Sequence, residues 1–120
     1  MTVRALRGAI QIVGEDRDEY FVQIQQLLRE MFSQNQVSQE ELISILFTAT
    51  PDLKIDFPAA AARKMGLTEV PLMCAVEMDI AGALPRTIRI LAHANLERSR
   101  AEIKHIYLGG AVVLRPDLAK

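Results

Sequence analysis

The chain has 120 residues, of which 50% are hydrophobic and 24% charged, which is typical of one folded domain and excludes a mainly disordered chain. Its net charge of -1 argues against a nucleic-acid coat protein or a membrane-surface binder. Most of its basic residues are arginine, the side chain that binds planar carboxylates through two parallel hydrogen bonds.

The first part of the chain predicts a strand followed by a long helix. Residues 2–13 favour a strand that is interrupted at Gly8. Asp16 is suited to cap a helix, and the apolar residues after it recur at the spacing of a single helix face. These residues are Tyr20, Phe21, Ile24, Leu27, Leu28, Met31 and Phe32. We therefore expect a helix of about four turns that lies on a sheet.

The middle of the chain predicts a short turn, a buried strand and a short helix. Residues 38–41 have the S-x-x-E form of a capping box, which is consistent with a single turn. The apolar run of 42–49 predicts a buried strand, which Pro51 ends because proline lacks a donor for the sheet. Residues 56–66 favour a helix with Asp56 as its cap and a glycine as its stop.

Further strands follow toward the end of the chain. Residues 71–79 and 87–94 both favour strands, and apolar residues alternate along the second. Residues 103–108 and 111–114 predict short extended segments joined by a hairpin turn at Gly109-Gly110. The order β-α-β-α-β-β-β predicts one α+β domain over residues 1–120, a mixed β-sheet with helices packed on one face.

Familiar catalytic and metal-binding motifs are missing from the sequence. His93 and His105 are far apart in sequence and do not have the spacing of metal ligands. The glycines form neither a phosphate loop nor a dinucleotide fingerprint. Cys74 lies in an apolar strand, where a small buried side chain is the default, so covalent catalysis is not expected. With one cysteine, no apolar leader and no apolar run of about 20 residues, we expect a soluble cytoplasmic protein.

Charged side chains within apolar strands are the unusual feature of the sequence. Arg7, Glu77 and Arg89 each have an apolar neighbour in a predicted strand. They lie either on a solvent face or in a polar pocket, because burying an unpaired charge costs several kcal/mol. On a regular strand Cys74 and Glu77 face opposite sides of the sheet. One pocket could hold both only through a bulge or through two subunits, and a chain this small favours a pocket between subunits.

Several blocks of the sequence are similar to one enzyme family. They are Val3–Ala9, Ala49–Leu53, Phe57-Pro58-Ala59 with Arg63, Val70-Pro71 leading to Cys74, Glu77-Met78-Asp79, Arg89, Tyr107-Leu108 and Ala111–Leu118. Together they resemble the monofunctional AroH class of chorismate mutases nearly from end to end. The resemblance implies an enzyme that converts chorismate to prephenate for phenylalanine and tyrosine biosynthesis. It also implies a homotrimer with a barrel-like sheet core and active sites between subunits, with no cofactor, metal, nucleic acid or membrane involved.

The resemblance also assigns roles to individual residues. Arg89 lies nearest the ether oxygen of chorismate, Arg7 and Tyr107 bind one carboxylate and the ether side, and Glu77 accepts the substrate hydroxyl. The cleft around them is lined by Phe57, Ala59, Met73, Cys74 and Leu114, with Arg63 and Arg115 as gate residues near the outer carboxylate.

One position departs from the family pattern. A lysine is common after Phe-Pro-Ala, and this chain has Ala60 there, so we expect weaker substrate capture with the chemical step less affected. Two alternatives stay open at this point. One is an imine deaminase-like enzyme of similar fold, and the other is a non-catalytic trimer that binds a small anion.

Overall fold

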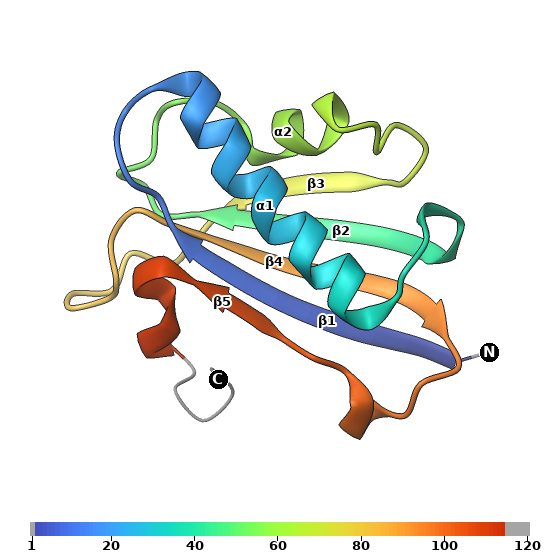
Figure 1. Ribbon diagram of the computed structural model, residues 1–120. Helices are drawn as coiled ribbons and strands as arrows, with labels where there is room; N and C mark the ends of the chain where they lie inside the picture. Colours follow the sequence, from blue (N-terminus) through green and yellow to red (C-terminus); the bar gives the residue numbers. More distant parts are fainter. Residues whose placement is uncertain (1, 115–120) are drawn as a thin grey trace.

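A computed structural model describes residues 2–114 of the chain. Within these residues five strands form one mixed sheet in the order β3-β2-β4-β1-β5, and two helices lie across one of its faces (Figure 1). The strands are β1 (Thr2–Gln11), β2 (Leu42–Ala49), β3 (Leu72–Val76), β4 (Thr87–Leu96) and β5 (Ile106–Leu108). The helices are α1 (Arg17–Asn35) and α2 (Pro58–Lys64), with short 3-10 turns η1 (Gln39–Glu41), η2 (Arg100–Glu102) and η3 (Gly109–Leu114).

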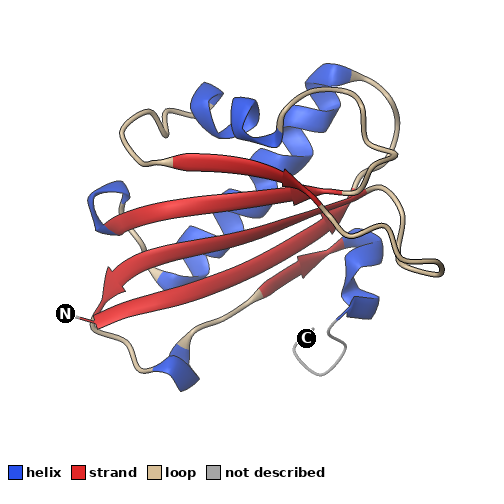
Figure 2. Cartoon of the chain, turned by 180° about the vertical axis from the view of Figure 1, so that it is seen from behind, coloured by secondary structure: helices blue, strands red, loops and turns tan. Residues whose placement is uncertain are grey.

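The two faces of the sheet differ in what covers them. β4 lies at the centre, antiparallel to β1 and β2, and the outer strands β5 and β3 run parallel to β1 and β2. Seen from behind, the face opposite the helices is left uncovered by the elements of residues 2–114 (Figure 2). Along β4, side chains from Ile88 to Leu96 are buried at alternate positions, which confirms the predicted alternation. The even-numbered positions therefore face the helices, and Arg89, Leu91 and His93 face the uncovered side.

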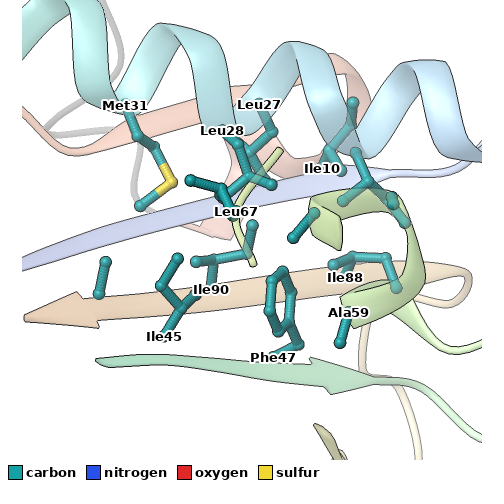
Figure 3. Packing of buried hydrophobic residues seen from close by; sticks show 14 of the residues in the cluster. Ile10, Leu27, Leu28, Met31, Ile45, Phe47, Ala59, Leu67, Ile88 and Ile90 are labelled. Atoms are coloured by element: carbon teal, nitrogen blue, oxygen red, sulfur yellow. The ribbon is translucent and has the colours of Figure 1, made fainter. Parts of the chain in front are cut away.

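The helix α1 supplies most of the core and follows the sequence pattern closely. The Asp16 carboxylate accepts the backbone N–H of Glu19 at 2.9 Å, so the predicted cap is confirmed. The apolar stripe of α1 packs on β1 and β4, where Ile10, Leu27 and Ile90 meet (Figure 3). α1 has 19 residues, about one turn more than expected. No helix within residues 2–114 has the length and apolar character needed to cross a membrane.

The predicted interruption of the first strand at Gly8 is wrong. β1 runs through Gly8, which pairs with Ile90 on one side and Ile106 on the other. A Cβ added at Gly8 would overlap Met31 and press on Leu27, both on α1. Glycine stands here because α1 lies close over the strand, and this close approach is invisible to local pattern.

The elements between α1 and β3 match their predictions except at one cap. β2 covers the predicted range, and the capping box at Ser38 opens a single 3-10 turn. The N-cap of α2 is Phe57 and not Asp56, as we expected from the sequence. The carboxylate of Asp56 instead accepts the backbone N–H of Phe57 at 2.7 Å, one residue before the helix, and Pro58 occupies the first turn.

Two strand boundaries shift because pairing partners decide where strands end. The strand predicted over 71–79 is limited to β3, since its partner β2 ends at Ala49, where the chain turns. One further bond continues the pairing, from the Glu77 N–H to the Ala49 carbonyl at 2.9 Å. The second shift is in β4, which continues past its predicted end at Ala94 to Leu96, because Leu96 pairs with Thr2 of β1.

The predicted hairpin turn at Gly109-Gly110 and the extended segment after it are wrong. Residues 109–114 form η3, and Gly109 turns the chain out of β5 with φ of 57°. A Cβ at Gly110 would meet the side-chain amide of Gln11, which would have to move aside. Ala111 is fully buried, so the chain folds back onto the end of the sheet where an extended segment would leave this apolar residue exposed.

Candidate active site

The uncovered face of the sheet holds a pocket of about 410 Å³ lined by polar side chains from widely separated segments. Arg7 comes from β1, Arg89 from β4 and Tyr107 from β5, and Glu77 follows directly after β3. The rest of the lining consists of Gly8, Ala9, Leu46, Thr48, Ile90 and Leu91. The structure therefore brings together all four polar residues that the sequence had singled out for the centre of the site.

Strand register explains why these residues meet. Ala9 of β1 pairs with Arg89 on one side and with Tyr107 on the other. Arg89 in turn pairs with Thr48 of β2. Side chains at paired positions share a face, so these residues form one row across the sheet. Ala9, whose small side chain is buried, lies between Arg89 and Tyr107 in this row and belongs to the lining of the pocket.

Glu77 and Arg89 form an ion pair within the pocket. Arg89 Nε lies 3.3 Å from Glu77 Oε2. This Nε is buried and makes no hydrogen bond to the described residues, while 41% of the Arg89 side chain stays exposed. The same Glu77 oxygen accepts a hydrogen bond from Thr48 Oγ1 at 2.8 Å. The carboxylate is thus held from the side of β2, and the guanidinium remains accessible.

Arg7 and Tyr107 complete the polar lining. Arg7 is exposed, and its backbone N–H donates to His105 Nδ1 at 3.0 Å, just before β5 begins. Tyr107 is half-buried at the middle of β5. The two guanidinium groups and the phenol can donate hydrogen bonds to an anionic ligand. The carboxylate can accept a hydrogen bond from a hydroxyl group of the same ligand.

A second groove of about 520 Å³ lies at the edge strand β3 and contains other predicted residues. Phe57 is 69% exposed there, and Cys74 lies on β3. Cys74 pairs with Phe47, which is buried under the helices, so Cys74 faces the helix side of the sheet. Among the described residues, the two linings share none. The prediction that Cys74 and Glu77 face opposite sides is therefore confirmed.

Hydrogen bonds and charge fix the loop that carries Phe57. The Phe57 N–H and then the Arg17 guanidinium lower the pKa of Asp56, which keeps this carboxylate charged. The hydroxyl of Tyr20 donates to the Asp56 backbone carbonyl at 2.7 Å. Burial first, and then the negative charge of Cys74 and Asp56, raises the pKa of Tyr20 well above its ordinary value.

Of the remaining predicted residues, those within residues 2–114 do not line the central pocket of one chain. Ala59 is buried in α2, and Arg63 is exposed on the same helix. Met73 is 66% exposed on the uncovered face, opposite Leu46 in the register. Leu114 ends η3. Arg115 lies outside the described residues.

Sequence reasoning missed Thr48, which lines the pocket and contacts Glu77. A signal was present, since Ser44 and Thr48 are the polar positions of an otherwise apolar run and lie four residues apart on one face. Nothing in the sequence reveals that this face meets Glu77. Within residues 2–114, no three histidine, cysteine, aspartate or glutamate side chains gather as a metal site would require.

Comparisons with known proteins give a consistent result. The family described as chorismate mutase type I matches residues 3–118. The chain is 43% identical to the chorismate mutase AroH of Thermus thermophilus, over 97% of this chain and 96% of the relative. It is 37% identical to the chorismate mutase AroH of Bacillus subtilis, over 99% and 94%. A solved chorismate mutase from Clostridium thermocellum superposes with a TM-score of 0.88 at 44% identity, covering 91% of this chain and 97% of that one.

Proposed function

Since this chain belongs to the chorismate mutase type I family and converts chorismate to prephenate, we propose that its active site is shared between neighbouring copies of a homotrimer. Membership of this family decides against the two alternatives considered from the sequence, an imine deaminase-like enzyme and a non-catalytic trimer that binds a small anion. The observation that carries the proposal is the separation of the site residues. Arg7, Glu77 and Arg89 line the pocket on the uncovered face, whereas Phe57 and Cys74 line a groove on the other side of the same sheet. A second copy supplies the missing half.

The uncovered face supports an assembly as well. Val3 is 53% exposed and Met73 66% exposed, and Ala5, Leu46 and Leu91 also point to this side. An apolar sheet face with no helix over it marks an interaction surface. In a ring of identical chains, each copy presents one surface to one neighbour and a different surface to the other. A trimer that buries these faces forms a barrel-like core and brings the two half-sites together.

In this proposal the site works by restraint and charge. The rearrangement breaks one ether C–O bond and forms one C–C bond within a single molecule, and no proton is transferred. Negative charge grows on the ether oxygen as the C–O bond lengthens. Arg89 places a positive charge beside that oxygen, and such preorganised donors contribute roughly 10²–10³ in rate in other enzymes. Holding chorismate compact removes the entropy cost of reaching the reactive conformer.

The other residues orient the substrate. Arg7 and Tyr107 bind one carboxylate and the ether side, and the Glu77 side chain accepts a hydrogen bond from the ring hydroxyl. Phe57, Ala59, Met73, Cys74 and Leu114 form the cleft wall. Arg63 and Arg115 attract the outer carboxylate, and because Ala60 contributes no charge there, the KM for chorismate is raised more than kcat is lowered.

Complementation tests the shared site. The double variants Phe57→Ala/Arg63→Ala and Glu77→Ala/Arg89→Ala damage different half-sites and are each expected to be nearly inactive. Co-refolded at equal amounts, they form sites at random, and about a quarter of the sites combine two intact halves. Activity is followed as loss of the diene absorbance of chorismate.

Each double variant refolded alone serves as the control, and circular dichroism shows whether it has folded. Regained activity in the mixture, with none in the controls, supports the shared site. Two folded variants whose mixed trimers stay inactive would overturn it. A single chain that is active and monomeric in light scattering would also refute it.

A further inference from the structure

We propose that Thr48 is a positioning residue for this reaction. Its hydroxyl holds the Glu77 carboxylate, so that Glu77 faces the substrate hydroxyl and Arg89 keeps its charge directed at the ether oxygen. This inference rests on the roles proposed above for Glu77 and Arg89.

The place of Thr48 in the sheet makes this role possible. Thr48 pairs with Arg89 on one side and with Ala75 on the other. Its side chain therefore lies between the strand that carries Arg89 and the strand that leads to Glu77. A β-branched side chain in a strand has few rotamers, which restricts where the hydroxyl points.

The contacts show how Thr48 affects the ion pair between Glu77 and Arg89. Thr48 Oγ1 donates to Glu77 Oε2 at 2.8 Å, and Arg89 Nε lies 3.3 Å from the same oxygen without forming a hydrogen bond. The hydroxyl thus occupies the oxygen that Arg89 would otherwise bind. Without this donor, the carboxylate is free to rotate onto the guanidinium and form a closed, two-bonded ion pair.

A closed pair would impair both catalytic roles. Glu77 would turn its oxygens away from the substrate hydroxyl, and its charge would offset that of Arg89 at close range. The positive charge matters most in the transition state, when the ether oxygen becomes negative. Loss of the Thr48 hydroxyl therefore lowers kcat more than it raises KM.

The test compares variants that keep or remove the hydroxyl. Thr48→Val has nearly the same shape without the donor, and we expect kcat/KM to fall about tenfold, as for the loss of a hydrogen bond to a charged group. Thr48→Ser keeps the donor and should retain activity within about twofold of the unchanged protein, by the same reasoning. Ser44→Ala is the matched control, because Ser44 lies on the same strand and face outside the pocket, and its activity should be unchanged.

A double-mutant cycle with Glu77→Gln separates this inference from the proposed site. If Thr48 acts through Glu77, Thr48→Val costs little further activity once Glu77 is replaced. A folded Thr48→Val protein with full activity overturns the inference, while a Glu77→Gln protein that keeps full activity overturns the proposed role of Glu77 in the site. An equal loss in both backgrounds refutes the route through Glu77. If Thr48→Val folds poorly, Thr48→Ala also lacks the hydroxyl and carries the same expectation.

Discussion

At the scale of single residues, side chains that lie next to one another perform different tasks on the two faces of the sheet. Arg89 and Ile90 are adjacent in β4, yet one lines the polar pocket and the other packs under α1. Tyr20 combines both kinds of environment, because its ring is buried in the core and its hydroxyl donates to the Asp56 carbonyl. Tyr20 thereby links α1 to the loop that carries Phe57.

The raised pKa of Tyr20 predicts a pH-dependent contribution to stability. Above pH of about 10 the unfolded chain loses this phenolic proton while the folded chain keeps it, so stability falls as pH rises. Tyr20→Phe loses one hydrogen bond, which costs about 1 kcal/mol at pH 8. It also lacks the phenol whose raised pKa destabilises the fold at alkaline pH, so near pH 11 the variant should gain about 1.4 kcal/mol relative to the unchanged protein and become slightly the more stable of the two.

Urea unfolding of both proteins at pH 8 and pH 11 measures this difference, at one protein concentration because assembly contributes to stability. Tyr107 is present in both proteins, so any effect that it has drops out of the difference in stability. A difference that stays constant between the two pH values would contradict the raised pKa.

At the scale of elements, a buried asparagine joins the end of α1 to the segment that leads into β5. Asn35 is fully buried and contacts the backbone of Lys104 twice. Its amide donates to the Lys104 carbonyl at 2.8 Å, and its carbonyl accepts the Lys104 N–H at 2.7 Å. The two bonds satisfy backbone groups outside the sheet and hold the chain where Tyr107 enters the pocket.

Asn35→Ala should destabilise the protein by about 1–3 kcal/mol, because it leaves a part-buried backbone donor and acceptor of Lys104 without their partner. Thermal unfolding measures the loss as a lower Tm. Gln34→Ala, one position earlier on the exposed side of α1, is the matched control and should change stability by less than about 0.5 kcal/mol. Equal effects of the two substitutions would show that the Asn35 link contributes nothing.

At the scale of the whole molecule, one chain buries its core on one face of the sheet only. The helices α1 and α2 cover that face (Figures 1 and 2). The opposite face presents the polar pocket among apolar side chains. A domain of this size has little material for a second layer. Packing against other copies covers the second face in the assembly that we propose.

Leu91→Glu should prevent that assembly. Leu91 lies on central strand β4 and points to the uncovered face, where a carboxylate would be solvated in a single chain but buried without a partner in a trimer. We expect a folded monomer in light scattering, and because Leu91 also lines the pocket, the oligomeric state is the readout of this test. Val22→Glu adds the same charge on the exposed side of α1 and should leave a trimer. A Leu91→Glu protein that remains a trimer would contradict this interface.

The sequence by itself determined the fold class and most elements of this protein. The stripe of α1, the Asp16 cap, the alternation along β4 and the apolar run of β2 depend on residues near one another in the chain, and each was confirmed. The residues matching the family also pointed to chorismate mutase activity, which the comparisons confirm. Arg7, Glu77, Arg89 and Tyr107 were named from the sequence, and their shared pocket is now visible.

Only the tertiary structure decided features that depend on distant partners. β1 continues through Gly8 because this residue pairs with both β4 and β5, and the chain after Gly109 turns into η3, which buries Ala111. The hydrogen bond from Thr48 to Glu77 joins β2 to the residue that follows its neighbouring strand β3, and these two segments are far apart in the sequence. Local pattern encodes periodicity and caps, whereas packing and pairing depend on which distant segments the fold places side by side.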